Sequence, residues 1–77
     1  MDIKKGQIWS HYKHPSREYE ILEIGKNSNN INEEIVVYKA LYESDLPFGQ
    51  VWVRSKKEFF DIIEINNKKL QRFSKIR

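Results

Sequence analysis

Trp52 and Arg54 are the residues whose types and spacing best suit binding chemistry in this chain. They lie two positions apart in residues 51–54, a run typical of a β-strand, so their side chains should share one face. A flat aromatic ring beside a guanidinium can hold a base, another ring or a phosphate. An Arg can also cover a small core with its apolar stem. The pair therefore indicates a binding face without naming the ligand.

Further aromatic and basic residues alternate along other predicted strands and would extend this face if the strands adjoin. In this hypothesis Trp52 and Tyr38 stack on a ring. Arg54 and Arg72 pair with phosphate, and His11 supplies a hydrogen bond. The residues of the predicted ligand site are His11, Tyr12, Tyr38, Trp52, Arg54 and Arg72.

The same residues also have a purely structural interpretation. Trp9, Tyr38 and Trp52 could form the core, since the aromatic residues must supply much of the buried area of a chain this short. Arg54 could form a salt bridge with Glu58 or Asp61. Exposed pairs of that kind contribute little stability, which favours a binding role for Arg54.

Catalytic and metal-binding patterns are scarce. The chain has neither a Gly-rich phosphate loop nor a Gly-x-Ser-x-Gly turn, and His11 is the one candidate general acid. There is no cysteine, and His11 and His14 are three apart in an extended pattern, which does not suit a shared metal ion. We therefore expect a binding protein that is not an enzyme and uses no metal or cofactor.

The charge is unevenly distributed along the chain. Residues 1–53 carry a net charge of −2, and residues 54–77 carry +5. This asymmetry favours an anionic partner near the C-terminal third, although an AT-rich genome would also enrich lysine. Nucleic acid would need a long basic track, whereas a small anion needs a few convergent groups. The sparse arginines and the acidic first part favour the small anion.

The chain pattern predicts the elements that would position these residues. Strands are expected at residues 7–12, 19–25, 34–42 and 51–54, with a turn at 13–17 and loops at 26–33 and 43–50. Along 19–25 the apolar residues change phase between Ile21 and Leu22, which predicts a β-bulge. The strand at 34–42 is apolar on both faces and should be central.

The C-terminal third carries the clearest local signals. Ser55 should cap a short helix, with Glu58 completing a capping box. Phe59, Ile62 and Ile63 have helical spacing and predict the buried side of that helix. Asn66-Asn67 separates two strand-like runs, 63–65 and 68–73, and predicts a hairpin with a type I′ turn.

Together these elements predict one domain, residues 1–77, of the mainly β class. The expected architecture is a small SH3-like five-stranded antiparallel barrel with one short helix. No apolar run is long enough to span a bilayer, and no secretory leader pattern is present. We therefore expect a cytoplasmic protein without a membrane partner.

Five segments in a fixed order resemble a small bacterial and phage family of unknown function. They are Lys5–Lys13, Tyr19–Leu22, Val36–Tyr42, Trp52–Arg54 and Arg72-Phe73. The family pattern has a His-Tyr-Lys-Gly opening, a Val-Val-Tyr-x-Ala-Leu-Tyr strand, a Trp-x-Arg-Pro motif and a closing Arg-Phe. This chain has His14-Pro15 in place of the Gly after His-Tyr-Lys, and Ser55 in place of the Pro after Trp-x-Arg. The resemblance, from Lys5 to Ile76, supports the fold and the selected residues but implies no reaction.

These observations lead to a hypothesis about function. The chain is expected to be a binding module for a small anionic, nucleotide-like ligand, held in a pocket or at the seam of a homo-oligomer. The hypothesis extends to a phage protein that sequesters a bacterial immune signalling nucleotide. The alternative is a nucleic-acid-binding or protein-interaction adaptor that uses the same basic and aromatic face.

Overall fold

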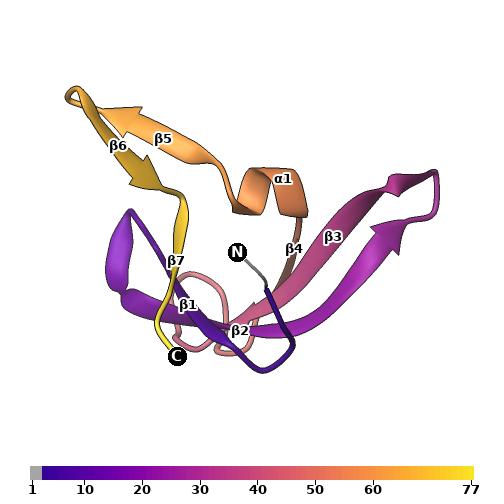
Figure 1. The fold of residues 1–77 in the computed structure, drawn as a ribbon. Helices are drawn as coiled ribbons and strands as arrows, with labels where there is room; N and C mark the ends of the chain where they lie inside the picture. The colour runs from indigo at the N-terminus through magenta and orange to yellow at the C-terminus, as the bar shows by residue number, and fades with distance from the viewer. Residues whose placement is uncertain (1–2) are drawn as a thin grey trace.

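The computed structural model describes residues 3–77 and is mainly β with one short helix (Figure 1). This confirms the predicted mainly β class and the single short helix. The elements are β1 (Ile8–His11), β2 (His14–Asn27), β3 (Asn30–Ala40), β4 (Val51–Ser55), α1 (Lys56–Phe59), β5 (Ile62–Ile65), β6 (Lys68–Gln71) and β7 (Phe73–Lys75).

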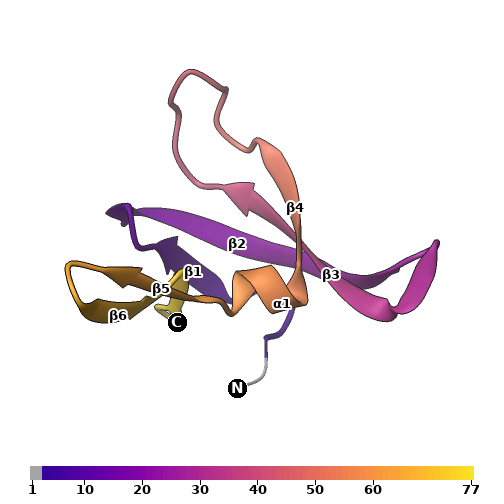
Figure 2. The same ribbon diagram turned by 90° about the horizontal axis from the view of Figure 1, so that it is seen from above.

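Five strands form one bent antiparallel sheet in the order β4-β3-β2-β1-β7, and β5 and β6 form a separate hairpin. The long strands β2 and β3 curve beneath α1, while the β5–β6 hairpin and the far end of β2–β3 extend to opposite sides (Figures 1 and 2). Within the described residues β4 and β7 are edge strands, so this sheet does not close on itself.

The predicted bulge in the second strand is confirmed at Leu22. Ile21 pairs with Tyr38 and Glu23 pairs with the next residue, Val37, so Leu22 is the extra residue. A bulge of this kind bends and twists the strand. The bend keeps Tyr19 and Ile21 buried on the concave face of the sheet.

The prediction of a polar loop at residues 26–33 is wrong, because β2 and β3 continue to a tight turn between Asn27 and Asn30. The Asn27 side chain accepts a hydrogen bond from the Asn29 amide (2.9 Å) and donates one to Glu33 (3.1 Å). Asparagine side chains commonly close turns in this way. The predicted turn at 13–17 is also shorter than expected, since β2 begins at His14.

The helix begins as the sequence predicts and ends sooner. The Glu58 amide donates to Ser55 Oγ at 3.1 Å, which confirms the N-cap. The predicted capping box is wrong, because the Glu58 carboxylate lies 3.6 Å from the Arg54 guanidinium and does not bond back to the Ser55 amide. The helix ends at Phe59, and the Asp61 N–H donates a hydrogen bond to Glu58 O where the chain turns into β5. The predicted helical positions of Ile62 and Ile63 are therefore wrong. Both residues lie in β5, where Ile62 is 57% exposed.

The Asn66-Asn67 hairpin is confirmed. Both residues have positive φ, 52° and 65°, as a type I′ turn requires. The second predicted strand, however, divides after Gln71. Phe73 begins β7 and pairs with His11 of β1, so the closing strand belongs to the larger sheet.

The core lies between the concave face of the sheet and α1, and it is largely aromatic. Phe59, the buried residue of α1, stacks on Phe73 with ring centroids 4.1 Å apart. Trp9 is fully buried and meets Phe59 edge-on, so the structural interpretation of Trp9 is correct. The buried core residues are Ile3, Trp9, Tyr19, Ile21, Val36, Tyr38, Ala40, Phe59 and Phe73. This layer forms the floor of the candidate site.

Candidate ligand site

Strand register brings the predicted binding residues of β3 and β4 together. Tyr38 lies directly opposite Trp52, and Val36 lies opposite Arg54. Directly opposed residues share one face of a sheet. Trp52 and Arg54 therefore lie on the same concave face as Tyr38.

His11 contributes to this face from β1, toward the opposite edge of the sheet. It is the register partner of Phe73, and their rings meet edge-on with centroids 4.9 Å apart. Phe73 in turn meets Tyr38 at 5.5 Å and lies 5.7 Å from the Arg54 guanidinium carbon. The aromatic faces that the sequence placed on separate strands thus adjoin through Phe73.

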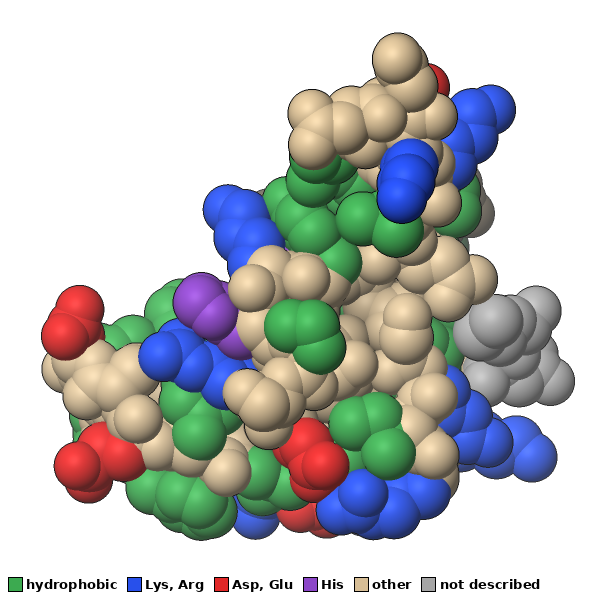
Figure 3. All heavy atoms as spheres, turned by 90° about the vertical axis from the view of Figure 1, so that its left-hand side faces the viewer, with side chains coloured by type: hydrophobic (Ala, Val, Ile, Leu, Met, Phe, Trp, Pro, Cys, Tyr) green, Lys and Arg blue, Asp and Glu red, His purple; other side chains and the backbone are tan. Residues whose placement is uncertain are grey.

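A hollow of about 220 Å³ opens on this surface. Four of the six predicted site residues line it: His11, Tyr38, Trp52 and Arg54. On the face in Figure 3, histidine side chains lie beside Lys or Arg and hydrophobic side chains. The remaining lining residues are Lys13, His14, Tyr19, Tyr42 and Phe73. Among the described residues that line the hollow, none carries a carboxylate.

Tyr12 and Arg72, the other two predicted residues, are neighbours of the hollow and do not line it. The Tyr12 ring stacks on His11 at 4.7 Å. Arg72 donates from Nε to Glu58 O at 3.1 Å, and its Nη2 lies 3.5 Å from Asp61. Arg72, which follows β6, thus ties the end of the β5–β6 hairpin to α1 through Glu58. Its backbone amide donates to Asp61 O, just before β5, and so joins the two ends of the hairpin.

The two large rings of the site differ in accessibility. Tyr38 is 4% exposed, so it belongs to the core as well as to the floor of the hollow. Trp52 is 41% exposed. An exposed indole beside a hollow can stack on a planar ligand without any rearrangement of the core. Trp52 is therefore the better candidate for stacking.

Arg54 is positioned by several weak contacts. Its side chain is 28% exposed, with Nη1 3.6 Å from the Glu58 carboxylate and Nε 3.4 Å from the Tyr38 hydroxyl. The salt bridge expected under the structural interpretation is thus present. Both distances are long for charge-assisted bonds. An anion at shorter distance could engage the same guanidinium.

His11 is held neutral at physiological pH. Burial is the largest cause that lowers its pKa from 6.5 to about 4, and the positive charges of Arg54, Arg72 and Lys13, with neighbouring His14, supply the rest of this shift. Its Nδ1 accepts a hydrogen bond from the Lys13 amide at 3.2 Å, which assigns the proton of the neutral ring to Nε2. His11 is therefore a hydrogen-bond donor in an electropositive environment.

Tyr19 and Tyr42 form a second polar feature of the lining. Their hydroxyl oxygens lie 2.6 Å apart, and burial, together with this hydrogen bond, raises the pKa of Tyr19. The Tyr19 hydroxyl therefore stays protonated at neutral pH. Tyr42 also lies under the Arg17 guanidinium at 4.7 Å. This pair adds two hydroxyl groups to the lining of the hollow.

Sequence reasoning missed several lining residues. Tyr42 and Phe73 stand in the segments that resemble the family, which was a usable signal for them. Lys13 and His14 were assigned to a turn, and their place beside the hollow depends on β2 beginning at His14. That start could not be read from the local pattern.

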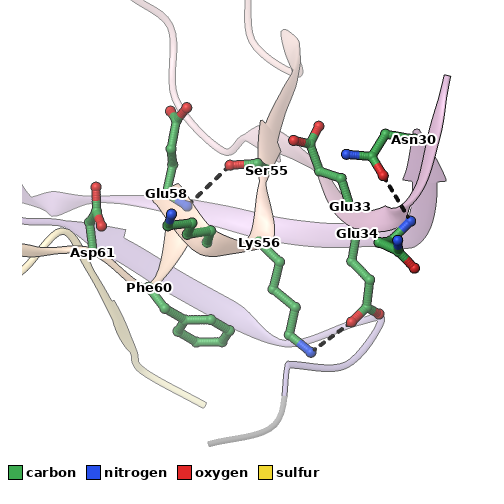
Figure 4. A pocket seen from close by; sticks show the side chains of 10 residues that line it. Asn30, Glu33, Glu34, Ser55, Lys56, Glu58, Phe60 and Asp61 are labelled. Atoms are coloured by element: carbon green, nitrogen blue, oxygen red, sulfur yellow. Dashed lines mark hydrogen bonds and ion pairs between the residues drawn. The ribbon is translucent and has the colours of Figure 1, made fainter. Parts of the chain in front are cut away.

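A larger hollow, of about 890 Å³, lies elsewhere, between α1 and the turn end of β3 (Figure 4). It contains none of the predicted site residues. Four carboxylates line it, and Lys56 lies 3.4 Å from one of them, Glu34. Its lining residues are Asn30, Asn32, Glu33, Glu34, Ser55, Lys56, Lys57, Glu58, Phe60 and Asp61. With more acidic than basic side chains, it does not suit an anion.

Within residues 3–77 no three His, Cys, Asp or Glu side chains are grouped so that they could hold a metal ion. The helix described there is far too short to cross a bilayer.

The fold and site define a small, mainly β protein with a basic, aromatic-lined hollow on the concave face of its sheet. Residues 7–75 match the family described as Protein of unknown function (DUF1653), and the chain belongs to that family. The match includes every predicted site residue. No curated protein and no solved structure matches the chain.

Proposed function

We propose that this protein is a non-enzymatic binding module for a small anionic, nucleotide-like ligand. The observation that carries the proposal is the convergence of Trp52, Arg54 and neutral His11 on one hollow whose described lining has no carboxylate. Trp52 stacks on the ring of the ligand, Arg54 pairs with its phosphate, and His11 Nε2 donates a hydrogen bond. Arg72 contributes through its charge near His11.

The size of the hollow favours partial enclosure of such a ligand. Its volume of about 220 Å³ lies below the roughly 300–1,000 Å³ of typical small-molecule pockets. A phosphate and part of a sugar would occupy the hollow, and the base would extend over the exposed Trp52. The predicted stacking role of Trp52 agrees with its place at the rim.

The proposed biological role follows from binding without catalysis. A small cytoplasmic module that holds a nucleotide signal would lower its free concentration, as expected for a phage protein that sequesters a bacterial immune signal. The bent antiparallel sheet with a helical turn before its C-terminal strands also supports the SH3-like arrangement that we infer.

The alternative is an adaptor for nucleic acid or protein that uses the same face. Lys68 and Lys69 are exposed on the β5–β6 hairpin and could extend a basic surface toward a polymer. Arg72, the nearest link between this hairpin and the hollow, is paired with Asp61. The basic surface is thus interrupted, which favours the small ligand.

Calorimetric titration with inorganic phosphate, AMP, cyclic di-AMP and single-stranded DNA tests the proposal. We expect a nucleotide to bind more tightly than phosphate, because the ring adds stacking. Arg54→Ala should abolish nucleotide binding with little change in melting temperature. Arg77→Ala is the matched control, since Arg77 pairs with Glu18 on the surface and should leave binding unchanged. A large loss of stability in Arg54→Ala without any nucleotide binding by the natural chain would assign Arg54 to the scaffold.

A further inference from the structure

The edge strand β4 exposes apolar residues on both of its faces. Val53 is 67% exposed, and Val51 and Trp52 are also exposed. Edge strands are usually protected by charge, proline or short length. The opposite edge, β7, has three residues and ends in an exposed Lys75. β4 lacks such protection in its centre.

The backbone of β4 has groups available for further pairing. Ala40 N donates to Gln50 O at 2.9 Å, and hydrogen-bonded pairs alternate along an antiparallel ladder. By this alternation Trp52 and Arg54 direct their backbone groups toward β3. Val51 and Val53 direct theirs outward. Val51 O accepts a hydrogen bond from the exposed Gln50 side chain at 3.1 Å, which an added strand would replace.

We propose that two copies of this chain pair through antiparallel β4 strands with Val53 opposite Val53. The outward backbone groups of Val53 then bond to each other across the two-fold axis, as an isologous contact requires. Val51 of one copy lies opposite Ser55 of the other.

The strand that pairs with the edge of β4 comes from a second copy, because β4 is complementary to itself in this register. Trp52 of one copy lies directly opposite Arg54 of the other, in the pairs where side chains approach most closely. An aromatic ring next to a guanidinium is a favourable cross-strand contact. An unrelated strand would match these positions by chance only.

The pairing also completes the candidate site. Trp52 and Arg54 line the hollow on the concave face, so each hollow gains a Trp52 and an Arg54 from the second copy at its open rim. The two hollows then join across the two-fold axis. This consequence rests on the proposed function, and it assigns the joined site to a dinucleotide with two phosphates.

Light scattering after gel filtration, over a concentration series, tests the pairing without any ligand. The natural chain should approach twice its 9.3 kDa mass. Val53→Lys should remain at the single-chain mass, because it places two lysines opposite each other. Ile31→Lys is the control, since Ile31 is 70% exposed at the distant β2–β3 turn. A single-chain mass for the natural protein throughout, or a doubled mass for Val53→Lys, would overturn the proposal.

Disulfide cross-linking tests the register with a variant that barely changes the strand. The chain has no cysteine, so Val53→Cys introduces a single thiol. The Cα atoms of a directly opposed hydrogen-bonded pair, about 5.5 Å apart, lie within the range of disulfides. Mild oxidation should give a covalent dimer of Val53→Cys and little of Ile31→Cys. Equal cross-linking of both variants would rule out this register.

Titration with cyclic di-AMP tests the joined site separately. We expect one dinucleotide per two chains of the natural protein and at least ~10-fold weaker binding to Val53→Lys. Equal affinity for both would overturn the joined site. A doubled mass and a Val53→Cys dimer without binding of any nucleotide would confirm the pairing and contradict the proposed function alone.

Discussion

The His11 imidazole meets the Phe73 ring edge-on, with 4.9 Å between centroids, and the two residues are register partners across β1 and β7. This contact joins the first strand of the chain, β1, to the last, β7. It also withdraws His11 from water next to Arg54 and Arg72, which is why its pKa falls to about 4.

The lowered pKa of His11 predicts a loss of stability in mild acid. The unfolded chain binds a proton near pH 6.5 and the folded chain only near pH 4, so stability falls as the pH decreases through this window. The full shift corresponds to ~3 kcal/mol, which partial solvent exposure reduces to about 1–2 kcal/mol. Denaturation at pH 7, 5.5 and 4 should show this loss, and His11→Gln should show a smaller one. Identical pH profiles would remove His11 as the cause.

Ser55→Ala should destabilise the protein by about 1 kcal/mol, because the Glu58 amide loses its acceptor at the helix N-terminus. Urea denaturation measures the change. Ser74→Ala, at an exposed position of β7, should leave the midpoint in place. An unchanged midpoint for Ser55→Ala would show that this cap contributes nothing.

Phe59→Ala should cost about 3–5 kcal/mol, since it removes the buried ring that stacks on Phe73 and meets Trp9. A domain of this size has little stability to spare, so the variant should be largely unfolded by circular dichroism. Phe48→Ala is the comparison, because Phe48 is exposed in the loop before β4. Similar effects of the two changes would contradict the assignment of Phe59 to the core.

The salt dependence of binding separates the two candidate functions. A nucleic-acid binder that contacts several phosphates releases counterions, so its affinity falls steeply with salt. A nucleotide held by stacking and one or two phosphate contacts should show a shallow slope. We expect weak, salt-sensitive binding of single-stranded DNA and tighter, salt-tolerant binding of a mono- or dinucleotide. Tight DNA binding at physiological salt, with no nucleotide bound, would favour the adaptor.

Local signals in the sequence determined several features of this protein. Ser55 marks the start of the helix, because its hydroxyl reaches an amide only three residues away. Asn66-Asn67 specifies the type I′ hairpin through the tolerance of asparagine for positive φ. The phase change at Leu22 marks the bulge. Each feature depends on a few consecutive residues, so sequence alone was sufficient.

Tertiary structure decided what the local pattern left open. The helical spacing of Phe59 and Ile62 favoured a longer helix, but the chain turns at Asp61 and pairs Ile62 with Gln71. The asparagines before Glu33 predicted a loop. In the structure β2 and β3 stay paired up to the turn, because the backbone of each strand provides hydrogen-bond partners for the other. Competition between local helix or loop propensity and long-range strand pairing is invisible in a single sequence.

The candidate site shows the same division most clearly. The sequence identified Trp52 and Arg54 as one face of a strand, from alternation alone. Only the register of β4 on β3 and of β7 on β1 placed that face beside His11 and Phe73 and left Arg72 paired with Asp61. Register is set by the bulge, the turns and the burial of Phe59 acting together, so the convergence of these side chains is a property of the whole fold.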